Sequence, residues 1–240
     1  MNAIDDFFKF DPVWQMDNSE RFALLAILDY LKPALSLEIG SRHGGSLARI
    51  SKYSKRVISL DIDPTVPVRL GHFTNVEFVV GDSRKTLPAL LGRLQKEGTP
   101  LQFALVDGDH TTEGALADCQ HIIAVRPLGP LIMLIHDSFN PDVRKGIESV
   151  AWRECPYVHA LEMDLIPGVI SAEARLRREM WGGFALAILK PEERIGPLQI
   201  SAMADLSYKI ARPLSVHHLL TRRILQIGGK FRGSGGNKDA

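Results

Sequence analysis

Residues 38–45 of this chain read Glu38-Ile39-Gly40-Ser41-Arg42-His43-Gly44-Gly45. This glycine-rich stretch follows a short apolar run that begins at Ala34, and it precedes a stretch compatible with a helix, residues 46–53. A glycine-rich turn between a strand and a helix is where an α/β sheet receives a nucleotide-like ligand. Glycine suits such a turn because a side chain would hold the ligand away from the backbone, and because tight turns often need a positive φ.

The carboxylate at the end of the expected strand narrows the choice of ligand. A dinucleotide site presents a helix N-terminus to a pyrophosphate, and Glu38 would repel that charge. The dinucleotide fingerprint G-x-G-x-x-G is also absent, because position 42 is arginine. A ligand with an amino group and a sulfonium, such as S-adenosylmethionine, is compatible with Glu38. We therefore interpret the turn as a methyl-donor site, to which these residues contribute: Glu38, Gly40, Ser41, Gly44, Gly45 and Ser46.

Composition and charge describe an ordinary globular protein. The chain has 240 residues, of which 45% are hydrophobic and 24% charged, and these are usual values. A net charge of +1 gives no reason to expect a nucleic acid as partner. Two cysteines are too few for a disulfide framework, which favours a reducing compartment. The first residues do not resemble a signal peptide and no run of 18 apolar residues occurs, so we expect a cytoplasmic protein without a membrane span.

Apolar runs that alternate with capped or amphipathic stretches predict the fold class. Strands are expected over 35–39, 57–60, 76–80, 103–106, 131–135, 157–161 and 184–189, and helices over 45–53, 86–96, 111–124 and 141–152. Strands alternating with helices indicate a parallel sheet. The last two strands lack a clear helix between them, so the last strand is expected to be antiparallel and inserted beside its predecessor. We expect an α/β fold with a doubly wound, Rossmann-like sheet of seven strands.

Two segments flank this expected domain, which covers residues 34–190. An N-terminal helical segment, 1–33, contains a helix over 18–31 that begins with a cap-like sequence at Asp17. A C-terminal helical extension is expected over 191–227. After Pro213 its apolar residues have helical spacing and are expected to dock on the core, on a second subunit in a homodimer, or on an anionic membrane surface. The remaining residues, 228–240, are rich in glycine, serine and lysine and are expected to be disordered.

The second and third expected strands end in residues suited to an adenosine. Asp61 lies 21 residues after Gly40, at a strand end from which an acidic side chain accepts hydrogen bonds from ribose hydroxyls. Ile62 follows and would face the adenine. The alternative is that Asp61 caps a helix, but its strand-end position and spacing favour the ribose role. Asp82 and Ser83 either contact the adenine amino group or cap the next helix, and these two interpretations stand equally.

Carboxylates and histidines follow the fourth and fifth expected strands. The two strand ends meet in one crevice of a doubly wound sheet. Asp107 and Asp137, with His136 or Ser138, could hold a hard divalent cation. His110 or His136 is then the candidate general base, because only histidine has an unperturbed pKa near neutral pH. The alternative is that Asp107 orients the amino group of the donor and His110 caps the next helix.

Three motifs together carry a resemblance to a known family: LEIGSRHGGS (37–46), VDGDHTTEGALAD (106–118) and LIHDS (134–138). With them the chain resembles class I S-adenosylmethionine-dependent methyltransferases, in particular the small-molecule group that includes macrocin O-methyltransferase and the cephalosporin-hydroxylase-like enzymes. The resemblance extends over about residues 34–190, and Trp181-Gly182-Gly183 also looks like this group. It implies S-adenosylmethionine as cofactor and methyl transfer to a hydroxyl oxygen of a small molecule or glycan.

The resemblance also implies a metal site. Related magnesium-dependent members, including the catechol and caffeoyl-coenzyme A methyltransferases, use one aspartate after the fourth strand and an acidic or amide pair after the fifth. Asp107 and Asp137 match this pattern in position, so Mg²⁺ is an expected second cofactor. The chain departs from the pattern beside Asp137. It has His136 and Ser138 where those relatives have a glutamate before, or an asparagine after, the aspartate.

Two functions other than methyl transfer are compatible with a nucleotide-binding α/β fold: a binding module and an oxidoreductase. The chain could be a donor-binding module without turnover that acts as a partner in a biosynthetic complex, but the acidic and histidine residues at both strand ends favour an enzyme. A nicotinamide-linked oxidoreductase is disfavoured by Glu38 and Arg42. The acceptor is not specified by the sequence, because the loops that build acceptor pockets in this fold vary most. A sugar, a phenol and a lipid-linked glycan all fit.

Overall fold

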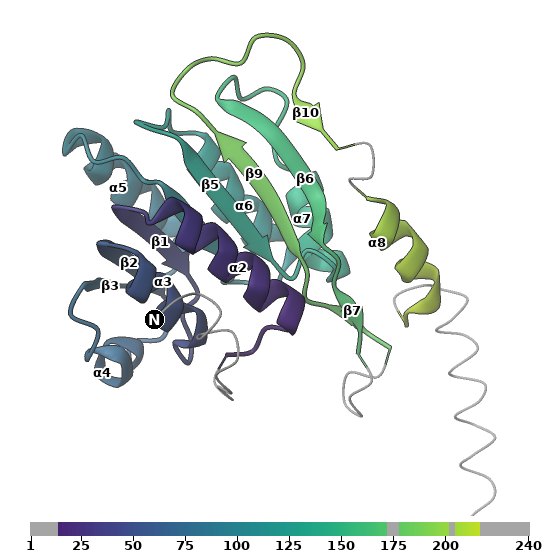
Figure 1. Ribbon diagram of the computed structural model, residues 1–240, viewed down its shortest axis with the longest axis horizontal. Helices are drawn as coiled ribbons and strands as arrows, with labels where there is room; N and C mark the ends of the chain where they lie inside the picture. The colour runs from purple at the N-terminus through teal and green to yellow at the C-terminus, as the bar shows by residue number, and fades with distance from the viewer. Residues whose placement is uncertain (1–13, 172–177, 202–204, 217–240) are drawn as a thin grey trace, which may run out of the picture.

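The computed structural model describes residues 14–171, 178–201 and 205–216, and Figure 1 shows a twisted sheet with helices on both faces. The sheet has eight strands in the order β10-β6-β9-β5-β4-β1-β2-β3. Its strands are β1 (Leu35–Ile39), β2 (Arg56–Asp61), β3 (Val76–Val80), β4 (Phe103–Val106), β5 (Leu131–His136), β6 (Val158–Ile166), β9 (Phe184–Leu189) and β10 (Gln199–Ile200). A separate two-stranded sheet pairs β7 (Val169–Ile170) with β8 (Met180–Trp181).

The helices connect these strands and cover the two faces of the sheet. They are α2 (Asn18–Leu31), α3 (Gly45–Tyr53), α4 (Val66–Leu70), α5 (Ser83–Lys96), α6 (Thr112–Ile123), α7 (Pro141–Glu148), α8 (Leu206–Ala211) and the 3₁₀ turn η1 (Arg212–Leu214). In Figure 1, α2 crosses the face nearer the viewer, and α6 and α7 lie behind the sheet. No helix among the described residues is long and apolar enough to cross a membrane.

The strand directions confirm the predicted fold class. Strands β1 to β5 are parallel to one another, whereas β9 runs antiparallel to both β5 and β6. The strand order reverses between β1 and β4, and ligands of doubly wound sheets bind outside the carboxyl ends of the strands at such a reversal. The predicted count of seven strands is one too few, because β10, a two-residue strand parallel to β6, was not expected.

Two predicted elements, β6 and α7, differ from the structure at ends that depend on tertiary contacts. Strand β6 continues to Ile166, five residues beyond its predicted end, because it pairs with β9 across two register shifts. Helix α7 ends at Glu148 rather than at residue 152. The buried Trp152 folds back there and donates a hydrogen bond from Nε1 to the carbonyl oxygen of Ile147, at 2.7 Å.

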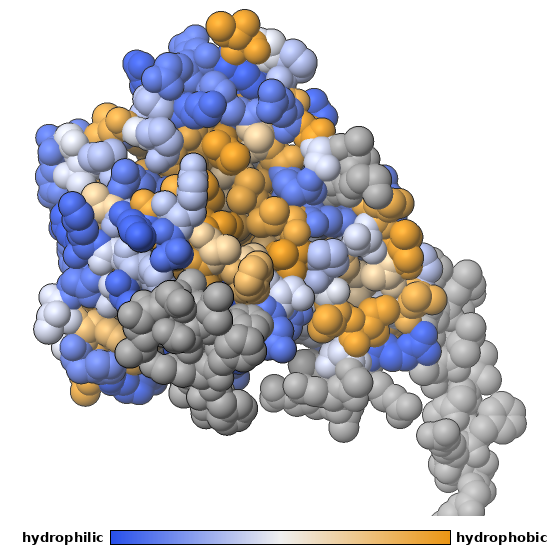
Figure 2. All heavy atoms as spheres, viewed as in Figure 1, coloured by the Kyte–Doolittle hydropathy of each residue, from blue (hydrophilic) through white to orange (hydrophobic). Residues whose placement is uncertain are grey.

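Two large apolar clusters lie on the two faces of the sheet, and a third, smaller one contains Phe139, Met180 and Tyr208. On the face that α2 covers, its buried residues Leu24, Leu25 and Leu28 pack in one cluster with side chains of α3, β2, β4 and β9. Figure 2 shows that apolar side chains gather in the middle of this face. The start of α2 has a capping box, in which the Asp17 side chain accepts from Glu20 N–H and the Glu20 side chain accepts from Asp17 N–H. The predicted N-terminus of this helix is confirmed.

The C-terminal part of the described chain docks on its own core. The buried guanidinium of Arg144 pairs with Asp164 at 2.7 Å and lies 4.6 Å from the ring centroid of Tyr208 on α8. The second carboxylate oxygen of Asp164 accepts a hydrogen bond from Tyr208 N–H. The helix predicted after Pro213 does not begin there, because residues 212–214 form a 3₁₀ turn that ends at an extended Ser215. The rest of that predicted helix and the predicted tail lie outside the described residues.

Candidate functional site

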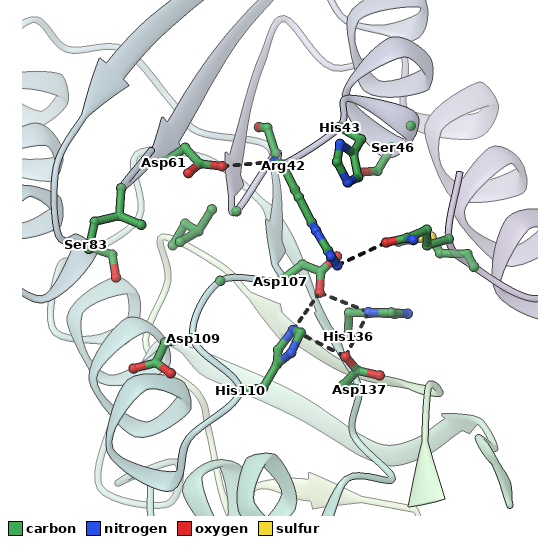
Figure 3. Close-up of a pocket in the computed structure, with 18 of the residues that line it drawn as sticks. Arg42, His43, Ser46, Asp61, Ser83, Asp107, Asp109, His110, His136 and Asp137 are labelled. Atoms are coloured by element: carbon green, nitrogen blue, oxygen red, sulfur yellow. Dashed lines mark hydrogen bonds and ion pairs between the residues drawn. The ribbon is translucent and has the colours of Figure 1, made fainter. Parts of the chain in front are cut away.

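A cavity of about 1000 Å³ opens at the carboxyl ends of the central strands (Figure 3). It brings together residues that follow β1, β2, β3, β4 and β5, together with residues 14–17 and the β7–β8 hairpin. The predicted site residues that border it are Gly40, Ser41, Gly45, Ser46, Asp61, Ile62, Asp82, Ser83, Asp107, His110, His136 and Asp137. Two further predicted donor residues, Glu38 and Gly44, are not among the residues that border it.

The turn after β1 makes close backbone contact with the end of β4. Gly40 has φ 85°, and a Cβ at this position would lie 2.1 Å from the carbonyl oxygen of Asp107. Only glycine fits there, because both the positive φ and the contact exclude a side chain. The same junction is closed by Asp107 N–H, which donates to the carbonyl oxygen of Ile39 at 2.9 Å. The glycine turn and Asp107, the residue that follows β4, are therefore in direct backbone contact.

Glu38 lies beneath this turn and holds it in shape. Its carboxylate is fully buried and accepts hydrogen bonds from the hydroxyls of Ser41, at 2.6 Å, and Ser46. Burial raises the pKa of Glu38 to about 7, and the nearby charges of Asp107 and Asp61 act in the same direction. The structure therefore assigns Glu38 contacts to the turn, whereas the sequence led us to expect it at the ligand.

Asp61 joins the end of β2 to the glycine turn. Its carboxylate accepts hydrogen bonds from Arg42 N–H at 2.9 Å and from Asp63 N–H at 2.8 Å. The alternative that Asp61 caps a helix is wrong, because α4 begins after Thr65. Ile62, beside it, is 70% exposed and borders the cavity. Both residues border the cavity, but their contacts with a ligand are untested. The role of Asp61 at the ribose and that of Ile62 at the adenine therefore stay predictions.

Asp82 is the N-cap of α5. Its side chain accepts from Arg84 N–H at 3.1 Å and pairs with the guanidinium of the same residue at 3.0 Å. The helix accordingly begins at Ser83, three residues before its predicted start. The capping interpretation of Asp82 is confirmed, and the adenine contact of Asp82 and Ser83 stays a prediction.

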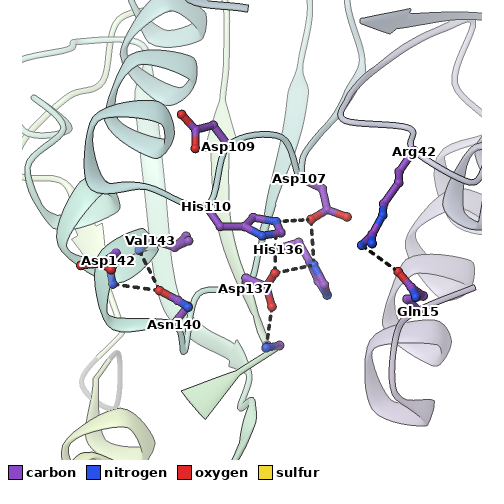
Figure 4. Close-up of polar contacts among 12 residues, drawn as sticks. Gln15, Arg42, Asp107, Asp109, His110, His136, Asp137, Asn140, Asp142 and Val143 are labelled. Carbon is purple, nitrogen blue, oxygen red and sulfur yellow. Dashed lines mark hydrogen bonds and ion pairs between the residues drawn. The ribbon is translucent and has the colours of Figure 1, made fainter. Parts of the chain in front are cut away.

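Two histidines and two aspartates converge at the ends of β4 and β5, as Figure 4 shows. The Nδ1 atom of His136 lies 2.9 Å from Asp107 Oδ1 and 3.6 Å from Asp137 Oδ2. The Nε2 atom of His110 lies 3.3 Å from each of these two carboxylates. Potential metal-binding atoms of Asp107, His136 and Asp137 all lie within 4.8 Å of one another. The expected meeting of the two strand ends is confirmed. His110 does not cap α6, because that role belongs to Thr111.

Opposite charges balance burial in this cluster. Burial alone would raise the pKa of Asp107, but His136 and His110 outweigh it and lower this pKa to about 2. Burial would lower the pKa of His136, but the charges of Asp107 and Asp137 raise it well above its usual value. The hydrogen bond to Asp107 likewise raises the pKa of His110. The side chain of His110 is 39% exposed and that of His136 only 8%, so His110 is the histidine that a second substrate can reach.

Sequence reasoning missed the residues that hold this cluster from the other side. The consecutive glycines 182 and 183 have φ values of 73° and 82°. Gly182 N–H donates to Asp137 Oδ1 at 2.6 Å, and Gly183 N–H donates to Oε1 of the buried Glu20 on α2. Trp181, next to them, approaches His110 edge-on with ring centroids 5.8 Å apart. In the sequence, Trp181-Gly182-Gly183 stands out only as part of the family resemblance, and Glu20 shows only its capping-box pattern.

Comparison with protein families identifies the central part of the chain. Residues 37–138, which run from β1 to just beyond β5, match the family model described as a methyltransferase domain. This segment, 102 of the 240 residues, is therefore similar to a methyltransferase domain. The expected resemblance to class I methyltransferases is thereby confirmed. No curated protein matches the chain by sequence.

Several solved structures share the fold of this chain at low sequence identity. An O-methyltransferase from Bacillus cereus in complex with SAH has 14% identity and a TM-score of 0.54, covering 79% of this chain and 98% of the other. The O-methyltransferase TomG from Streptomyces achromogenes, in complex with SAM, has 17% identity and a TM-score of 0.53, with 79% and 96% covered. A putative O-methyltransferase from Klebsiella pneumoniae has 15% identity and a TM-score of 0.52, with 79% and 97% covered.

The raised pKa of Glu38 predicts how stability depends on pH. With a folded-state pKa of about 7 against an ordinary 4.5, the folded methyltransferase keeps this proton where the unfolded chain loses it. The contribution of the neutral carboxyl is therefore full below pH 4.5 and is lost as the pH rises through 7. In Glu38→Gln this side chain no longer titrates. Between those limits, the unfolding free energy of the wild type should fall by about 3 kcal/mol relative to Glu38→Gln, measured by urea denaturation. A difference that is independent of pH would contradict this assignment.

Proposed function

We propose that this methyltransferase uses S-adenosylmethionine to methylate a hydroxyl oxygen of a small molecule or glycan. The observation that carries the proposal is that one cavity joins the glycine turn and Asp61 to the Asp107–His110–His136–Asp137 cluster. The first half has the features of a nucleoside site, and the second half has groups that can take up a proton. An O-methyltransferase needs groups that bind the nucleoside of the donor and, close to the methyl group of the same donor, a group that takes up the proton of the acceptor hydroxyl.

In this proposal the donor lies along the carboxyl edge of the sheet, from β3 to β4. Asp61 retains acceptor capacity for a ribose hydroxyl, because a carboxylate has about four lone-pair positions and Arg42 and Asp63 N–H groups use two. The exposed side chain of Ile62 offers apolar surface to the adenine. The backbone at Gly40 and Gly108 leaves the turn open for the aminoacyl part, since both residues border the cavity and lack a side chain.

The reacting half of the site must orient the acceptor and receive its proton. The acceptor oxygen forms a bond to the methyl carbon while the bond from that carbon to sulfur breaks, and the donor leaves as neutral S-adenosylhomocysteine. We assign the hydroxyl proton to His110 in its neutral form, because His110 borders the cavity and is the more exposed histidine. His136 is enclosed by carboxylates, and we assign it a role in holding the cluster together.

A divalent cation fits the residues of this cluster. Two carboxylates and an imidazole nitrogen converge within 4.8 Å among the described residues, and such a set needs positive charge between its members. Asp107, Asp137 and His136 would hold the ion. A bound cation lowers the pKa of a ligated hydroxyl, which is the chemistry it would supply to the acceptor.

Donor binding should depend on Asp61. Asp61→Ala removes acceptors for the ribose and also releases Arg42 N–H, so the dissociation constant for S-adenosylhomocysteine should rise about tenfold or more, equivalent to about 1.4 kcal/mol. Isothermal titration calorimetry measures it. A matched control is Asp63→Asn, which changes a half-buried carboxylate that borders the same cavity but pairs with Arg69 and Thr65, and its affinity should stay within about twofold. Wild-type affinity in folded Asp61→Ala would remove Asp61 from the donor site.

Methyl transfer should occur and should respond to chelation. With radiolabelled S-adenosylmethionine and a panel of phenols, sugars and lipid-linked glycans, we expect label in an ether-linked methyl group of at least one acceptor. Treatment with EDTA should then reduce the rate by about tenfold or more, and a divalent cation should restore it. An unchanged rate after exhaustive chelation would contradict the metal site and leave His110 as a metal-free base. Donor binding without transfer to any acceptor would instead favour a binding module.

A further inference from the structure

Glu20 is a buried carboxylate that reaches the reacting cluster from outside the methyltransferase motifs. It lies in the first turn of α2 and is 2% exposed. Its Oε2 accepts from Asp17 N–H at 2.6 Å, and its Oε1 accepts from Gly183 N–H. Two backbone donors therefore fix both oxygens, more than a helix cap requires. Oε1 also lies 3.3 Å from Nε2 of His136.

His136 consequently has a carboxylate at each ring nitrogen. Nε2 faces Glu20, whereas Nδ1 faces Asp107 at 2.9 Å and Asp137 at 3.6 Å. The contact between Nε2 and Glu20 is not aligned as a full hydrogen bond, so Glu20 acts on the ring mainly through its charge. The hydrogen bond between Nδ1 and Asp107, at 2.9 Å, needs a proton on Nδ1 in the metal-free protein, because a carboxylate only accepts. A cation at Nδ1 would replace that proton. The proton that the ring then keeps is the one on Nε2, which faces Glu20. The lone pair of Nδ1 then points at two further carboxylates, and these three acceptors repel one another unless a cation lies among them.

We propose that Glu20 is a positioning residue, which holds the Nε2 proton of His136 and directs Nδ1 toward Asp107 and Asp137. A nitrogen then joins two carboxylates as ligands, and this set favours a first-row transition-metal ion such as Co²⁺ or Zn²⁺ over Mg²⁺. The inference rests on the proposed metal site of the methyltransferase and adds the class of metal to it.

The chemistry of the ligands supports this choice of metal. Mg²⁺ is bound in proteins through oxygen atoms, whereas imidazole nitrogen binds zinc and its neighbours. A histidine that ligates a metal almost always donates its other N–H to a carboxylate or carbonyl, which fixes the ring and raises its basicity. Glu20 stands where such a carboxylate is needed.

The tandem glycines show that the surroundings are shaped for this carboxylate. A Cβ on Gly182 would lie 2.7 Å from Glu20 Oε1. The two consecutive backbone N–H groups of this turn donate to the carboxylates on either side of His136. Gly182 N–H donates to Asp137, and Gly183 N–H donates to Glu20. One turn thus sets the positions of a proposed ligand and of the proposed positioning residue.

Metal titration tests the proposal directly. Chelator-treated, full-length protein is titrated with Co²⁺ and with Mg²⁺ by calorimetry, and Co²⁺ binding is followed in parallel by visible absorption. We expect the wild type to bind Co²⁺ at least tenfold more tightly than Mg²⁺. Glu20→Gln should weaken Co²⁺ binding about 10- to 100-fold and leave the affinity for S-adenosylhomocysteine within twofold. Glu20→Asp, which withdraws the carboxylate from His136, should show the same loss and serves if Glu20→Gln does not fold.

Asp17→Ala separates this role from helix capping. It removes the side-chain cap of α2 and so lowers stability, but the backbone N–H of residue 17 still binds Glu20. Glu20 therefore stays beside His136, and Co²⁺ affinity should match the wild type. Wild-type Co²⁺ affinity in both Glu20 variants would overturn the positioning role. A wild type that binds no Co²⁺, or binds Mg²⁺ equally well, would overturn the choice of metal. If the wild type does not bind S-adenosylhomocysteine, the proposed function is contradicted instead, whatever the result of the metal titration.

Discussion

The close approach of Gly40 to the carbonyl group of Asp107 is the constraint on which the rest of the site depends. Because position 40 has no side chain, the turn after β1 packs directly on the end of β4. This contact lies at the reversal of strand order, so it places the expected nucleoside half of the cavity beside the acidic half. Glu38 supports the turn from below through two serine hydroxyls, and Asp61 supports it from the side through Arg42 N–H. A larger residue at position 40 would clash with the backbone of Asp107 and Gly108 and push the two halves apart.

The second organising feature is the balance of charge around His136. Three carboxylates from three separate parts of the chain face one buried imidazole. Burial of so many acceptors is unfavourable unless protons or a cation lie among them. The raised histidine pKa values and the lowered pKa of Asp107 are the response of the protein alone. The same arrangement is suited to exchange protons for a metal ion, because metal binding releases protons from its ligands. Stability and the proposed chemistry therefore draw on the same interactions.

Much of the fold follows from local sequence, and the reasons differ between elements. Strands β1, β3, β4 and β9 have their predicted bounds, because mainly apolar runs bordered by glycine, proline or polar residues specify both ends. Helix α3 also has its predicted bounds, between the glycine turn and Ser54. The meeting of Asp107 with Asp137 followed from topology, since the ends of neighbouring parallel strands lie at one edge of the sheet. Glu20 could not be found in this way, because it lies more than 80 residues before Asp107 and its pattern is fully explained by a helix cap. The burial of Glu38 beneath the turn also depends on packing that periodicity does not reveal. The short elements α4, β7, β8 and β10 are held by tertiary contacts rather than by their own sequence signals.

A crystal structure of the full chain grown with S-adenosylhomocysteine tests the central claim most directly. The account predicts that the ribose lies against Asp61, that the adenine lies beside Ile62, and that the sulfur points toward Asp107 and His110. The carboxyl-edge cavity would then contain the whole donor product, with room for an acceptor near Trp181. A donor product bound away from the glycine turn, or with its sulfur directed away from the acidic cluster, would contradict the account.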